Sequence, residues 1–320
     1  MPVCSNLNTR MTMVYICRAA LVCFLALLSL QLCAQSSIDE TAQLDAAEAT
    51  LKQNPKDSQA RQSEVNAAIA AALKAKAAGR NEDALGFLLR AKYWVPDDPE
   101  LLLDTGIQEE SMQLYKDADA TLAEAQRLRP DNLKTLYAVA RLKMNLGQTQ
   151  ASEDAWREYL KHRPDDATAH YGYGVLLQMM QRSDDARAQF LKSVELSPKQ
   201  AESYYRLGEI AREAGDLSQA KTYYEQTLAH LPSHAGALTG MAILAYQDHK
   251  YDEAEGDLEK AIAASPDFQT ARYYHGLTLA KLGRKDESQA ELDLAMRMAN
   301  EQNARKDKMK QLSAQPYQPR

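Results

Sequence analysis

The sequence predicts an all-α protein built as an array of tandem helical hairpins. Its prolines recur at a fixed spacing: Pro96, Pro130, Pro164, Pro198, Pro232 and Pro266 lie 34 residues apart. The chain is rich in Ala, Leu, Glu, Gln, Lys and Arg, which favour helices. No long stretch alternates Val, Ile and Thr with polar residues, so we expect no sheet. A fixed period of this length is typical of a solenoid, in which neighbouring units bury one another's apolar faces.

Residues 1–34 have the pattern of a secretory signal peptide. Arg10 and Arg18 accompany an apolar run over 19–32, and the segment ends on the small residue Ala34. The run is shorter than the roughly 20 residues that span a bilayer. We expect cleavage after Ala34 and an exported protein, periplasmic or extracellular. Cys33 leaves a lipid anchor as one alternative, and retention of the uncleaved segment as a membrane anchor is another.

Cysteine usage and charge exclude several classes of site and partner. All four cysteines, Cys4, Cys17, Cys23 and Cys33, lie within the first 34 residues. Disulfides and cysteine-metal sites are therefore not expected in the folded part. The formal net charge is −6, and the repeats contain no basic stripe. Because acidic groups repel the phosphate backbone, we expect no nucleic-acid partner.

Residues 35–64 are expected to form an N-terminal helix and a degenerate partial repeat. Pro55 precedes Pro96 by 41 residues, which is the repeat length plus seven. Seven residues make about two helical turns, so this insertion keeps the same face inward. The first helix of the first full unit is then longer than its counterparts.

Residues 65–300 divide into seven units when the recurrent proline is numbered position 32. The units begin at Val65, Pro99, Leu133, Ala167, Ala201, Ala235 and Gln269. Position 8 is always Ala or Gly and position 20 is always Ala or Ser, as expected where two helices approach closely. Position 24 is large and fills the space between them: Leu88, Leu122, Trp156, Phe190, Tyr224, Leu258 and Leu292. Gly79, Gly147, Gly215 and Gly283, at position 15, suit the left-handed residue that ends a helix.

Each unit is separated from the next by a short turn at the proline, which cannot continue the second helix. An aspartate directly follows four of these prolines, and we expect it to cap the next helix: Asp97, Asp131, Asp165 and Asp267. Residues 301–320 follow as a polar C-terminal cap and a disordered tail, with Pro316 and Pro319 near the end.

The pattern of a small residue at positions 8 and 20, a large one at 24, a small one at 27 and proline at 32 resembles the tetratricopeptide repeat family. It recurs in register over residues 65–300, with a larger residue, Tyr159, at position 27 of one repeat. The resemblance implies a right-handed α-solenoid whose first helices line a concave groove for peptides, extended segments or partner helices. Two features depart from the family pattern. Position 4 is rarely Trp, and Asn300 replaces the last proline.

The candidate groove residues lie on the first helices, mainly at position 5. This position carries Leu103, Tyr137, Tyr171, Tyr205 and Tyr273, and the cations Lys134, Arg141 and Arg206 lie nearby in the register. Tyrosine offers a broad apolar face and a hydroxyl with little rotamer freedom to lose, which suits recognition of a partner. The alternative is that the apolar face of the first helix is wide and that these tyrosines pack within it.

No motif predicts catalysis or a cofactor. The chain contains no Walker sequence, no G-x-S-x-G and no H-E-x-x-H. His230 and His234 are four residues apart, but Pro232 between them breaks the helix that would align them. We therefore expect no metal site, no cofactor and no enzyme activity.

The predicted function is protein binding outside the cytoplasm. We expect a scaffold or assembly factor of the cell envelope that holds another protein or a peptide in its groove. The alternative is a structural scaffold that associates with itself and has no peptide ligand. Membrane contact is expected only if the leader is retained or lipidated.

Overall fold

The computed structural model describes residues 42–314 and is all-helical over that range, which confirms the predicted fold class. Side chains are described as far as Arg305. The expected signal peptide lies outside the described residues, as do residues 315–320 of the expected tail. Within the described range, no helix combines the length and the apolar character needed to cross a membrane.

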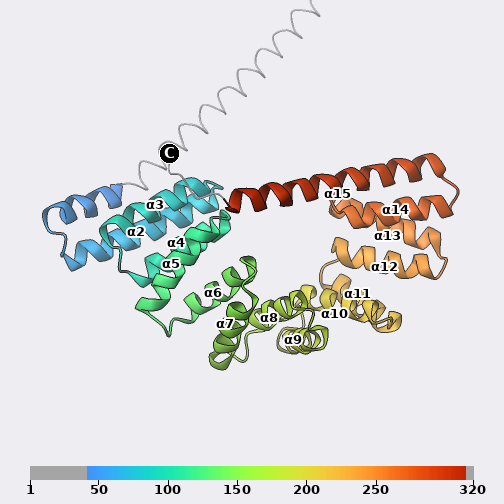
Figure 1. Ribbon diagram of the computed structural model, residues 1–320, viewed down its shortest axis with the longest axis horizontal. Coiled ribbons are helices and arrows are strands. Elements are labelled where there is room, and N and C mark those ends of the chain that lie inside the picture. Colours follow the sequence, from blue (N-terminus) through green and yellow to red (C-terminus); the bar gives the residue numbers. More distant parts are fainter. Residues whose placement is uncertain (1–41, 315–320) are drawn as a thin grey trace, which may run out of the picture. The chain divides into compact units, whose positions relative to one another are not determined.

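The helices follow one another in antiparallel pairs (Figure 1). A first helix over residues 42–53 precedes α2 (Ser58–Ala77) and α3 (Asn81–Trp94). The others are α4 (Pro99–Ser111), α5 (Tyr115–Leu128), α6 (Leu133–Asn145), α7 (Thr149–His162), α8 (Ala167–Met179), α9 (Ser183–Leu196), α10 (Ala201–Glu213), α11 (Leu217–His230), α12 (Ala235–Gln247), α13 (Tyr251–Ala264), α14 (Gln269–Lys281) and α15 (Lys285–Ala314).

The chain divides into two compact units, Met1–Ala155 and Trp156–Arg320, with the boundary inside α7. In each unit the paired helices form hairpins, α2 with α3 and α4 with α5 in the first, and α8 with α9 through α14 with α15 in the second. Successive first helices also contact one another directly, α2 with α4 and α4 with α6, and likewise α10 with α12 and α12 with α14. First helices therefore form a layer that runs from α2 to α6 in the first unit and from α10 to α14 in the second.

The two helices of each hairpin pack together where small residues face large ones. The residues at position 24 are buried or partly buried, and Trp156, Phe190 and Tyr224 are among the largest fully buried side chains. A Cβ placed on Gly174 would stand 2.7 Å from the Phe190 ring, so position 8 has no room for a side chain there. At position 20, the Ser152 and Ser288 hydroxyls are satisfied by donating to the position-8 carbonyls of Ala140 and Gly276, at 2.7 and 2.8 Å.

The helix caps differ from the expectation by one residue. The capping side chains are Asp98, Asn132 and Asp166, each of which accepts from backbone N–H groups in the first turn of the next helix. The residue directly after proline lies one position too early, because it belongs to the turn and the N-cap must immediately precede the helix. In the last turn the N-cap is Phe268, which makes no side-chain cap.

The residue at position 15 has the left-handed backbone conformation in all seven 34-residue repeats. Four of them use glycine, with φ between 70° and 82°, and the other three place Gln113, Gln181 and His249 at φ 59–63°. The hairpin turn thus requires this conformation whichever residue occupies the position, although a side chain is strained there. The residues expected to form a C-terminal cap are helical as far as Ala314, where α15 ends.

Candidate functional site

In the first unit, the surface of the first helices opens into an apolar hollow between α2 and α4. Its volume is about 120 Å³, and it is lined by Ile69, Ala72, Leu73, Lys76, Leu88, Asp104, Ile107 and Gln108. Leu73, at the edge of the hollow, is 64% exposed. The hollow has the size and polarity to take an apolar side chain of a bound segment.

Two charged groups border this hollow and give it polarity. Lys76 is exposed, whereas Asp104 is half-buried. Burial, reinforced by the nearby Glu100 carboxylate, raises the pKa of Asp104 above its usual value, and the positive charges of Lys134 and Lys76 oppose the rise. A ligand group that donates a hydrogen bond or carries positive charge would offset the cost of keeping this carboxylate ionised.

One of the predicted groove residues in this unit is buried, and another is held in an ion pair. Leu103 is buried, because α4 packs against α2, α3, α5 and α6 and uses nearly its whole apolar circumference. Arg141 pairs with Glu110 at 2.7 Å, and the Glu110 side chain is only 3% exposed. Arg141 is exposed and neutralises a buried carboxylate of its own chain. Lys134 is exposed and Tyr137 is half-buried.

In the second unit, Tyr205 of α10 is wedged between neighbouring elements. Its ring lies 4.6 Å from the His234 ring and 6.4 Å from the Tyr224 ring, and a Cβ on Gly236 would collide with it. The Arg206 guanidinium lies over the same ring, 5.8 Å from its centroid. Burial, and secondarily the Glu209 charge, raises the pKa of Tyr205 to about 12. Tyr205 thus joins α10 to the start of α12 and presents only part of its ring.

The other tyrosines of this unit differ in exposure. Tyr171 is half-buried with its ring 5.9 Å from that of Phe190, whereas Tyr273 is 44% exposed and packs edge-on against Tyr274 at 5.5 Å. The structure therefore places Tyr171, Tyr205 and Tyr273 on first helices of one unit. The apolar residues that line the hollow of the first unit, Ile69, Leu73 and Ile107, were missing from the predicted site. The sequence feature that could have identified them is the apolar character of positions 5 and 9 in the first two 34-residue repeats.

The difference in packing between Tyr205 and Tyr273 predicts that their replacement affects stability unequally. We expect Tyr205→Ala to lower the free energy of unfolding by about 2–3 kcal/mol, because a packed ring is lost between α10 and α12. Tyr273→Ala is expected to cost less than about 1 kcal/mol, since nearly half of its surface already faces solvent. Urea denaturation followed by circular dichroism measures both changes. Equal losses would contradict the packing described for Tyr205.

Stacked antiparallel hairpins with a layer of first helices define a class of helical repeat proteins. Two tetratricopeptide repeat models match the chain, one over residues 165–233 and the other over residues 239–302. The chain is therefore a tetratricopeptide repeat protein.

Known proteins with similar sequence or structure fit this assignment. The chain is 26% identical over 228 residues to the mouse protein O-mannosyl-transferase TMTC3, covering 66% of this chain and 25% of that protein. The chain thus spans about a quarter of the length of the curated relatives it matches first. A tetratricopeptide repeat protein from Parabacteroides merdae superposes with a TM-score of 0.61 at 19% identity, over 77% of this chain and 98% of that one. PilW, a type IV pilus biogenesis factor, superposes with a TM-score of 0.54 at 18% identity, over 60% and 90%.

Proposed function

We propose that the protein is an exported protein-binding module, a scaffold or assembly factor of the cell envelope that holds a partner protein or peptide. The observation that carries the proposal is the apolar hollow between α2 and α4, bordered by the highly exposed Leu73. Exposed apolar surface beside a shaped hollow is a feature of sites that anchor a partner's side chain. The fold, which resembles that of a pilus biogenesis factor, supports an assembly role.

The partly exposed tyrosines extend the proposed surface in the second unit. Tyr171 and Tyr205 are half-buried and Tyr273 is exposed, and Tyr137 and Lys134 hold positions 5 and 2 of the same repeat register in the first unit. Arg206 contributes its charge over the Tyr205 ring. Export is proposed from the pattern of residues 1–34, with cleavage after Ala34. The match to a transferase covers a quarter of that enzyme, and we propose no enzymatic activity for this chain.

Capture from the envelope fraction of the source organism tests the proposal. The bait is residues 35–320, and Leu73→Glu places a charge at the mouth of the hollow. We expect this variant to recover at least about tenfold less partner, because a buried charge opposes the apolar anchor. Tyr93→Glu is the matched control, since Tyr93 is 78% exposed on the second helix α3, away from the hollow.

The same baits separate binding from self-association. Equal recovery with both variants, or recovery of this chain alone, would contradict the anchor and favour a structural scaffold. Light scattering then decides the matter, because a self-associating scaffold gains mass with concentration and a groove binder does not. The double variant Tyr171→Ala, Tyr205→Ala tests whether the second unit also contacts the partner, once its helicity has been checked.

A further inference from the structure

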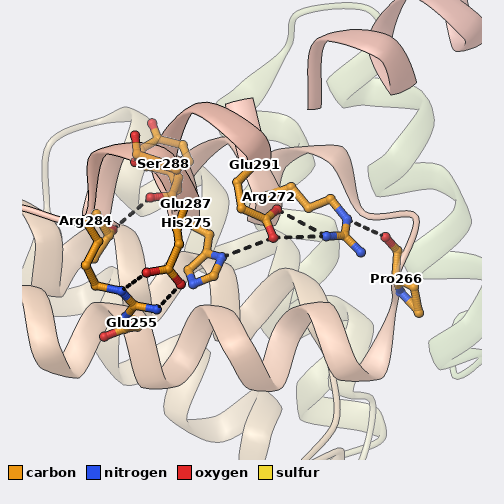
Figure 2. Close-up of polar contacts among 11 residues, drawn as sticks. Glu255, Pro266, Arg272, His275, Arg284, Glu287, Ser288 and Glu291 are labelled. Carbon is orange, nitrogen blue, oxygen red and sulfur yellow. Dashed lines mark hydrogen bonds and ion pairs between the residues drawn. The ribbon is translucent and has the colours of Figure 1, made fainter. Parts of the chain in front are cut away.

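A group of charged side chains lies where α13, α14 and α15 meet (Figure 2). Glu255 and Glu259 lie one helical turn apart on α13, and His275 lies on α14. One ligand atom from each of these three side chains can be chosen so that all three lie within 4.8 Å of one another. Glu287 and Glu291, also one turn apart, approach the same place from α15.

His275 lies beside the Glu291 carboxylate but makes no hydrogen bond in this group. Its side chain is 12% exposed, and neither ring nitrogen has a hydrogen-bond partner among the described residues. The Glu291 carboxylate lies 3.7 Å from Nδ1, which is beyond hydrogen-bonding distance. Leaving two ring nitrogens buried and unpaired is costly, and such an arrangement calls for a physical explanation.

The charges of the group do not balance. Arg272 pairs with Glu291 at 3.1 Å, and Arg284 pairs with Glu287 at 2.7 Å and also with Glu255. With His275 neutral, the four carboxylates exceed the two guanidinium groups by two negative charges. A divalent cation would cancel this excess and leave the ion pairs of Glu291 and Glu287 in place.

We propose that Glu255, Glu259 and His275 form a binding site for a divalent first-row transition metal such as Zn²⁺. An imidazole nitrogen with two carboxylates is a ligand set that Zn²⁺ accepts, whereas Mg²⁺ and Ca²⁺ prefer oxygen ligands alone. Ligand atoms around a tetrahedral zinc ion lie about 3.3 Å from one another. The three ligand atoms here lie within 4.8 Å of one another, so small rotamer changes bring them to that spacing. Arg284 competes for Glu255 and releases it when the metal binds.

Because all three ligands come from neighbouring helices of the last two hairpins, the metal would join α13 to α14. Such a link stabilises the C-terminal end of the second unit, where no further hairpin follows within the described residues. The site is independent of the proposed partner-binding surface, so its failure would leave the proposed function untouched.

Isothermal titration calorimetry with ZnCl₂ tests the proposal on the full, untagged chain with its four cysteines replaced by serine. We expect one Zn²⁺ per chain. Glu259→Gln, which alters an exposed side chain and should not disturb folding, is expected to weaken binding at least about tenfold, and His275→Asn at least about 100-fold. Arg284→Gln is expected to tighten binding several-fold, because it removes the competing charge.

His162→Asn is the matched control, since His162 is an exposed histidine beside Glu158 in the same unit. It is expected to leave zinc binding unchanged. A chain that takes up no zinc, or one whose zinc binding is unaffected by both Glu259→Gln and His275→Asn, would overturn the proposal. Circular dichroism confirms that each variant retains its helicity before titration.

Discussion

Replacing Gly208 by leucine is expected to lower the free energy of unfolding by about 3 kcal/mol or more and to unfold the second unit locally. A Cβ at Gly208 would stand 2.6 Å from the Tyr224 ring. The ring has no room to retreat, because a Cβ on Gly240, on its other side, would stand 2.5 Å away. Tyr224 is fully buried, and its hydroxyl donates to Glu209. A side chain at Gly208 therefore forces α10 and α11 apart.

Hydrogen exchange locates this effect, because a repeat array transmits strain mainly to its nearest neighbours. We expect loss of protection in α10 to α13 and near-native protection in α2 to α5. Gly256→Ala is the control, since Gly256 lies inside α13 with no atom within 4 Å of the position that a Cβ would occupy. That change is expected to add about 0.5–1 kcal/mol, as alanine favours the helix. A Gly208→Leu protein with unchanged melting would refute the packing of position 8.

The fold was predictable because its determinants repeat along the chain. Each hairpin needs small residues at positions 8 and 20 and a large residue at 24, so seven imperfect copies define one register. The first helices α4, α6, α8, α10, α12 and α14 begin at the first residue of their units. The left-handed turn residue was only partly predictable, because three units place Gln or His where four place Gly. In those units, contacts elsewhere in the hairpin offset the local strain.

The candidate site was less predictable, because exposure depends on neighbours that the register does not reveal. Position 5 is the buried Leu103 in one 34-residue repeat and the exposed Tyr273 in another. Arg141 looked free in the sequence, yet it pairs with the buried Glu110 at 2.7 Å. The Glu255–Glu259–His275 group was missed since its members belong to two different repeat units. Only the packing of α13 against α14 brings them together.

The acidic residue Glu64 is expected to make the first unit less stable as the pH rises from about 5 to 7. Glu64 lies on α2 with no exposed surface, and neither carboxyl oxygen has a hydrogen-bond partner among the described residues. Burial, together with the nearby Glu48 charge, raises its pKa to about 7, and the Arg90 charge only partly opposes this. Arg90 is already engaged by Asp45 and Glu48, which hold the helix over residues 42–53 against α3.

The sign follows from proton binding in the two states. Below about pH 4.5 the carboxyl group is protonated whether the chain is folded or unfolded, so it contributes no pH dependence. Between about pH 4.5 and 7 the unfolded chain ionises Glu64 while the folded chain keeps its proton, and stability falls. A difference of about 2.5 pKa units corresponds to about 3 kcal/mol, reached near pH 7 and constant above it.

Glu64→Gln removes this penalty, because glutamine fills the same space without a charge. We expect the variant to match the parent near pH 4 and to exceed its stability by about 2–3 kcal/mol at pH 8. Urea denaturation at several pH values measures the difference. Glu82→Gln, on the exposed face of α3, is the control and should shift stability by less than about 0.5 kcal/mol at every pH. A stability difference between Glu64→Gln and the parent that stays flat from pH 5 to 8 would mean that Glu64 titrates as an ordinary solvated carboxyl group.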